Sequence, residues 1–70
     1  MLVEAFEDRQ GGSPVRGLAN LSSITGAEKY VAETAKEYPD LIRWDVTSSK
    51  SGRVTAQWIR TPGSTPKKVK

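Results

Sequence analysis

Apolar residues alternate with polar ones over three stretches of the chain, and this period of two predicts three strands. The stretches are residues 2–8, 42–47 and 54–59. In the first of them, Leu2 and Phe6 fall on one face, opposite the smaller apolar residues. The chain therefore contains one isolated strand near its start and two strands close together near its end.

The two later strands are expected to pair as a hairpin. Residues 50–52, Lys-Ser-Gly, make a three-residue turn in which the glycine takes the left-handed conformation. This turn sets Trp44 opposite Trp58 and Thr47 opposite Thr55. The register gathers the large apolar side chains on one face, which favours it over a slip by one residue.

The segment between the first strand and the hairpin has the repeat of an amphipathic helix. Thr25 and Glu28 have the spacing of a capping box, and Pro39 marks the end because a residue before proline leaves the helical region. The apolar stripe consists of Ala27, Tyr30, Val31, Thr34, Ala35 and Tyr38.

This order of elements predicts a small α+β domain of the β-α-β-β type. A three-stranded, mainly antiparallel sheet would carry the helix on its apolar face. We assign residues 1–61 to this single domain, with a flexible glycine-rich loop at about 9–17. Residues 62–70 are rich in Pro, Gly, Ser, Thr and Lys, and we expect them to form a disordered basic tail.

The composition excludes several kinds of chemistry. The 70 residues include no cysteine and no histidine, so disulfides, thiolate and imidazole metal sites, thiol nucleophiles and Ser-His arrangements are impossible. We expect a protein that is not an enzyme and that has no catalytic residues, metal or cofactor. A chain this short buries only about 60% of its unfolded surface, and association into a homodimer is one way to add stability.

Two weaker signals do not change this expectation. Residues 12–17 have the G-x-x-x-x-G spacing of a phosphate loop, but Leu18 and Ala19 stand where that loop has Lys and Ser or Thr. Glu4 and Asp8 share a strand face, which is more typical of an edge strand kept soluble by charge than of a catalytic pair.

The N-terminus has neither a basic start nor an apolar run, and no stretch approaches the roughly 20 apolar residues of a membrane span. We therefore expect a soluble, cytoplasmic protein without a membrane partner.

Charge is divided unevenly along the chain. Residues 1–40 hold seven acids and four bases, a net charge of −3, whereas residues 41–70 hold seven bases and one acid, a net charge of +6. A concentrated positive potential attracts anions over a distance. The C-terminal half is therefore expected to meet nucleic acid or an acidic protein surface.

Nucleic-acid binding by the basic hairpin and tail is the leading hypothesis. A two-stranded ribbon fits a major groove, and Arg, Thr and Gln are residue types that contact base edges and phosphates. Both DNA and RNA fit this pattern. The expected main contacts are Arg43, Lys50, Arg53 and Arg60, with Thr47, Thr55 and Gln57 as minor ones and Lys67, Lys68 and Lys70 adding unspecific attraction.

The tryptophans allow two interpretations. Packing against the helix stripe is the more usual role in a small domain, whereas exposed rings would serve as platforms on which single-stranded bases stack.

The alternative hypothesis is a protein-binding module, such as an adaptor or an inhibitor of a host or partner protein of the kind that phage or accessory genes encode. It would dock through the sheet face, a free strand edge or the acidic helix face. The residues concerned are Leu41, Ile59, Glu28, Glu33 and Glu37.

Overall fold

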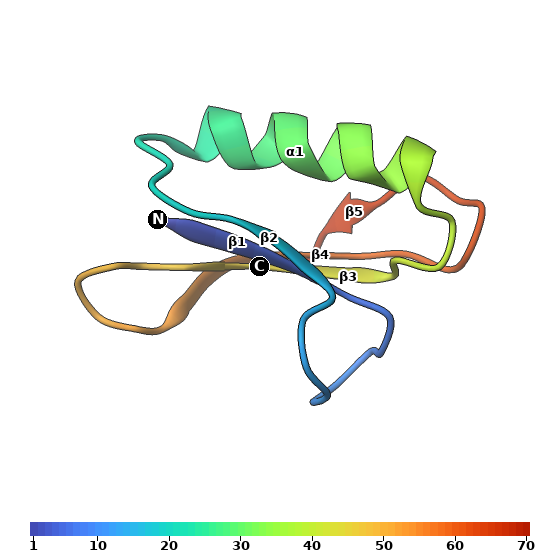
Figure 1. The fold of residues 1–70 in the computed structure, drawn as a ribbon, viewed down its shortest axis with the longest axis horizontal. Coiled ribbons are helices and arrows are strands. Elements are labelled where there is room, and N and C mark those ends of the chain that lie inside the picture. Colours follow the sequence, from blue (N-terminus) through green and yellow to red (C-terminus); the bar gives the residue numbers. More distant parts are fainter.

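The computed structural model describes all of residues 1–70 and consists of one helix packed on one face of an antiparallel sheet (Figure 1). The sequence-based assignment to the α+β class is therefore confirmed. The elements are β1 (Leu2–Phe6), β2 (Arg16–Leu18), α1 (Ile24–Glu37), β3 (Arg43–Thr47), β4 (Val54–Ile59) and β5 (Lys67–Lys68).

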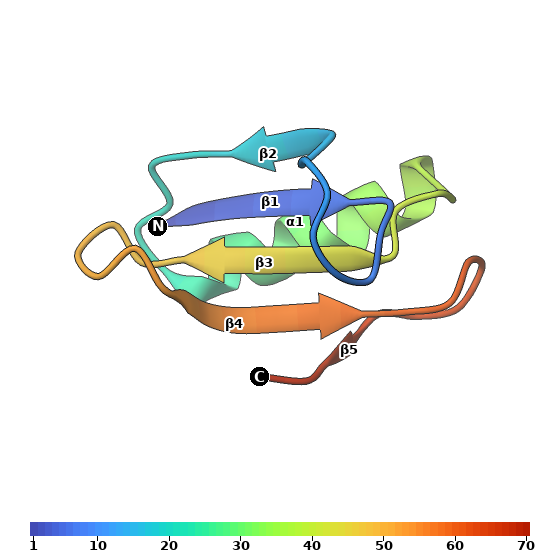
Figure 2. The same cartoon turned by 90° about the horizontal axis from the view of Figure 1, so that it is seen from below.

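The sheet has five strands in the order β2-β1-β3-β4-β5, as Figure 2 shows, so the predicted count of three is wrong. The two additional strands are short and lie at the edges. β2 begins within residues 9–17, which were expected to be a flexible loop, and β5 lies within residues 62–70, which were expected to be disordered. Both are held by backbone pairing with a longer neighbouring strand. Strands of three and two residues are too short to show an alternating side-chain pattern in the sequence.

The core lies between α1 and the sheet. Trp44 pairs with Trp58 and Val46 pairs with Ala56, as the hairpin register predicts. The pairing of Thr47 with Thr55 is wrong, because a bulge sets Thr47 opposite Val54 instead. A bulge inserts one residue into a strand and increases its twist, and here it moves only the end of the hairpin. The buried apolar cluster comprises Val3, Ala5, Ala27, Val31, Leu41, Trp44, Val46, Ala56 and Trp58.

The helix presents the expected stripe to the sheet but begins differently. Its N-cap is Ser23, whose side chain makes no capping hydrogen bond. Thr25 already lies inside the first turn, where the cap geometry is not available, so the predicted capping box is wrong. The end before Pro39 is confirmed, since α1 stops at Glu37 and Tyr38 is extended.

A polar contact crosses the core between helix and sheet. The indole N–H of Trp44 donates to the Thr34 hydroxyl at 2.9 Å, and that hydroxyl donates to the Tyr30 carbonyl at 2.7 Å. The indole N–H and the Thr34 hydroxyl therefore both have partners, which fixes the orientation of Trp44, the largest fully buried side chain.

The glycine-rich loop between β1 and β2 folds under the sheet, on the face opposite α1 (Figures 1 and 2). Gly11 has φ 64°, a left-handed conformation that glycine adopts without steric cost. Its carbonyl accepts a hydrogen bond of 2.9 Å from Arg43 Nη2. Phe6 lies beneath the same guanidinium, 3.8 Å from Cζ to the ring centroid, and is buried although it is on the face away from the helix.

Candidate nucleic-acid interface

The uneven charge of the sequence becomes an uneven charge in space. Each hairpin places consecutive strands side by side, so the C-terminal strands β3, β4 and β5 fill one side of the sheet and the N-terminal strands β1 and β2 fill the other. The acids of residues 1–40 lie on β1, on the loop that follows it, on α1 and at Asp40. The bases are concentrated at the β4–β5 edge and at the hairpin tip.

Five exposed bases follow this border, which we call the basic edge. Lys67 and Lys68 lie opposite Ile59 and Trp58, and the chain beyond β5 continues along β4. Arg53 and Lys50 lie at the turn that precedes β4. At about 3.3 Å per residue, the row spans roughly 20 Å. The members of the basic edge are Lys50, Arg53, Lys67, Lys68 and Lys70, all exposed.

None of these five bases is paired with an acid. The one ion pair in the structure joins Arg43 to Asp45. Lys68 is the only member near an aromatic ring, with Nζ 6.0 Å from the centroid of Trp58. The charges of the basic edge are therefore free to meet an external anion.

Arg60, expected to contact phosphate, is buried in the structure. Its guanidinium donates to four backbone carbonyls and has no carboxylate partner. Two of these carbonyls, those of Ala35 and Tyr38, belong to the end of α1, where the negative end of the helix dipole lies. This side chain thus ties the helix end to the sheet and leaves little for a ligand.

Arg43 is also buried, on the opposite face. Its Nε lies 3.5 Å from Asp45 Oδ2 without making a hydrogen bond. It holds the glycine-rich loop through Gly11 and covers Phe6. Neither of the two buried arginines therefore belongs to the basic edge.

The polar face of the hairpin is less basic than expected. Gln57 donates its side-chain amide to Asp45 at 2.9 Å, and Asp45 pairs across the sheet with Glu4. Thr55 is exposed, whereas Thr47 and Gln57 are half-buried. Two neighbouring carboxylates in the middle of this face repel phosphates, so the face itself is a poor surface for a nucleic-acid backbone.

Both tryptophans are in the core. Trp44 has no exposed surface and Trp58 is 6% exposed. Their role in packing is the one the structure supports, because a ring with so little accessible surface offers no platform for a base.

The residues named for protein docking are spread over different surfaces. Leu41 is 1% exposed and belongs to the core, and Ile59 is half-buried on the face away from the helix. The acids of the helix are exposed but alternate with Lys29 and Lys36. These acids are Glu28, Glu33 and Glu37. The structure does not bring them together with Leu41 and Ile59 into one surface.

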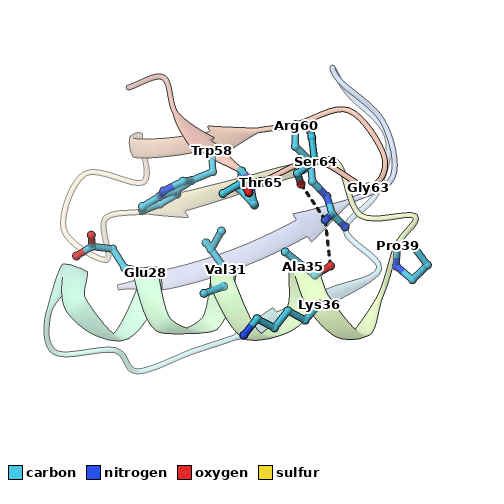
Figure 3. A pocket seen from close by; sticks show the side chains of 12 residues that line it. Glu28, Val31, Ala35, Lys36, Pro39, Trp58, Arg60, Gly63, Ser64 and Thr65 are labelled. Carbon is cyan, nitrogen blue, oxygen red and sulfur yellow. Dashed lines mark hydrogen bonds between the residues drawn. The ribbon is translucent and has the colours of Figure 1, made fainter.

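A groove of about 600 Å³ separates α1 from residues 60–66 (Figure 3). Val31 and Trp58 form its apolar base, and Arg60 bridges its two walls by bonding to Ala35 on the helix and to Ser64 on the loop. No buried polar atom of the groove lacks a partner. Its polar lining side chains Glu28, Lys36 and Thr65 are exposed at its rim.

No family model, curated protein or solved structure matches this chain. The side chains of Asp and Glu form no group of three or more that could hold a metal ion. The single helix is neither long nor apolar enough to cross a bilayer.

The sequence analysis named Arg43 and Arg60 among the main contacts, together with Lys50 and Arg53, whereas the structure buries both of these arginines. For Arg43, the alternation of side chains along the strand could have indicated burial. Arg43 lies opposite Ile59 and shares a sheet face with Phe6, so its surroundings are partly apolar. Arg60 gave no such signal, because its partners are carbonyls brought together only by the fold.

Proposed function

We propose that this protein is a non-enzymatic nucleic-acid-binding protein that contacts phosphates along the basic edge. The observation that carries the proposal is the row of five exposed bases without acidic partners. Duplex DNA carries one phosphate per strand for about every 3.4 Å of helix axis, so a row of roughly 20 Å is long enough to contact several phosphates. Contacts of this kind position a protein on nucleic acid without reading its sequence.

The burial of both tryptophans argues for duplex binding over single-strand binding. Single-strand binders gain about 1–3 kcal/mol from each stacked base, and this chain has no exposed Trp to supply it. The affinity then rests on charge density, which is higher for a duplex. We expect tighter binding to double-stranded than to single-stranded oligonucleotides of equal length.

Salt dependence gives the quantitative test. With three to five phosphate contacts, the logarithm of the binding constant should fall with the logarithm of salt concentration with a slope between about −2.7 and −4.5. Affinity should then drop about 40- to 500-fold between 50 and 200 mM salt. Fluorescence anisotropy with labelled double- and single-stranded oligonucleotides measures this directly.

Variants locate the binding surface. Arg53→Gln or Lys68→Gln should make the slope shallower by about one unit, whereas Lys29→Gln on the exposed helix surface removes the same charge and should leave the slope unchanged. If Arg53→Gln and Lys29→Gln changed the slope equally, the basic edge would not be the binding surface. No binding at 50 mM salt would end the nucleic-acid proposal and make an acidic protein surface the expected partner.

A further inference from the structure

The two buried arginines differ in how many of their donors are occupied. Arg60 makes four hydrogen bonds to carbonyls. Arg43 is equally buried, with 6% exposure, but makes a single hydrogen bond, from Nη2 to the Gly11 carbonyl. A guanidinium has five N–H donors, so Arg43 has most of its donors unassigned. Buried polar groups are normally paired, which makes this an unusual arrangement.

The unassigned donors lie beside a pocket. Nε of Arg43 is fully buried, lies 3.5 Å from Asp45 Oδ2 and makes no hydrogen bond, and the guanidinium's hydrogen bond to Gly11 comes from Nη2. Arg43 lines a pocket of about 580 Å³ between the glycine-rich loop and the hairpin. Its lining residues are Arg9, Gln10, Gly11, Arg43, Gln57 and Ile59.

The chemistry of this lining selects an oxyanion. Arg9 and Arg43 bring two guanidinium groups to one pocket, and Gln10 adds a side-chain amide. Guanidinium groups match the oxygens of phosphate in geometry as well as charge. Gln57 is occupied, because it donates to Asp45.

Asp45 balances the charge of Arg43, so the net positive charge of the lining comes from Arg9. Asp45 lies 3.5 Å from Nε of Arg43 on the sheet side, and the carboxylate of Asp8 lies against Gly12 in the loop. Neither of these acids is among the residues that line the pocket.

We propose that the pocket under the glycine-rich loop binds the phosphate group of a phosphomonoester. Its volume of about 580 Å³ exceeds what inorganic phosphate fills and falls in the range of about 300–1,000 Å³ typical of small-molecule sites. Ile59 provides an apolar surface for the organic part of the ligand. This site lies on the face away from α1 and is separate from the basic edge, so it goes beyond the proposed nucleic-acid function.

The phosphate could belong to a free small molecule or to the end of a nucleic acid. Titrations by NMR at constant ionic strength, with inorganic phosphate and with a nucleoside 5′-monophosphate as probes, test the shared chemistry. Saturable shifts of the Gly11 amide and the Arg43 Nε–H, with a Kd of about 1 mM or tighter for the monophosphate, are expected. Shifts that grow linearly without saturation would overturn the proposal.

The matched variants are Arg9→Gln and Lys29→Gln. Both residues are exposed, so neither change should unfold the chain. Arg9→Gln should weaken binding of the monophosphate about tenfold, while Lys29→Gln should leave it unchanged. Equal weakening by both variants would mean unspecific attraction and would overturn the site.

A pair of oligonucleotides identifies the source. If the ligand is a nucleic-acid end, a 5′-phosphorylated oligonucleotide should bind more tightly than its 5′-hydroxyl counterpart, and Arg9→Gln should abolish the difference. If the ligand is a free phosphomonoester, the two oligonucleotides should bind equally while the monophosphate still binds. Arg53→Gln weakens both oligonucleotides alike under the proposed function, so failure of one proposal is distinguishable from failure of the other.

Discussion

Replacing Arg60 by methionine should destabilise the domain strongly. Methionine keeps an unbranched apolar stem of similar reach beside Trp44 but removes all donors. The hydrogen bond from Nε to the Leu41 carbonyl, 2.6 Å long, is fully buried, and its loss leaves that carbonyl unpaired. Such a loss costs about 2–3 kcal/mol when the bond involves a charged group.

The other three hydrogen bonds of Arg60 are partly buried. They run to Tyr38 at 2.9 Å, to Ala35 at 3.0 Å and to Ser64 at 3.3 Å. Water can replace the donor in part, so we assign about 0.5–1 kcal/mol to each. The total loss is then about 3.5–6 kcal/mol, a large share of the roughly 3.5–10 kcal/mol expected for a domain of this length.

Urea unfolding followed by tryptophan fluorescence measures this loss, since both indoles are buried. Arg60→Lys keeps the charge and one or two bonds, and should cost about 1–3 kcal/mol. Arg53→Met, an equivalent change at an exposed base, should stay within about 0.5 kcal/mol. The reasoning is refuted if Arg60→Met loses less than about 1 kcal/mol or if Arg53→Met loses as much.

Two further predictions concern the core and the response to pH. Thr34→Val leaves the Trp44 indole N–H without its acceptor and should lower the free energy of unfolding by about 1–3 kcal/mol; an unchanged urea midpoint would contradict this. Burial raises the pKa of Tyr30 above 10.0, with Arg16 lowering it and Tyr38 raising it. The fold therefore favours the neutral phenol, whose stabilisation is complete below pH 10 and is lost as the pH rises through the folded-state pKa. Tyr30→Phe should make the alkaline loss of stability smaller, and identical alkaline profiles would refute the assignment.

The helix and the central hairpin could be predicted because their side chains carry a clear period. Val31 and Thr34 lie on the expected buried stripe, and the pairing of Trp44 with Trp58 follows from the alternation of apolar residues. Burial on one face decides both features, and burial leaves a pattern in the sequence.

The edge strands and the buried arginines could not be predicted in the same way. β2 and β5 have three and two residues, all exposed, so no hydrophobic face identifies them. Their pairing is a property of the backbone, which every sequence shares. The burial of Arg43 and Arg60 depends on carbonyls of Gly11 and Leu41, which are distant in the sequence. The candidate surface consequently contains five of the seven bases expected from the sequence.

The strand order also implies an order of assembly. The β3–β4 hairpin joins neighbouring segments and closes a short turn, so it can form early and on its own. β1 lies between β2 and β3, yet its pairing with β3 must wait until the whole of α1 has been made. Bringing β1 and β3, which are distant in the sequence, next to each other costs chain entropy before their contacts form. We therefore expect docking of the β1–β2 hairpin onto β3 to be the slow step in folding, and the backbone edge of β3 to be unpaired until it occurs.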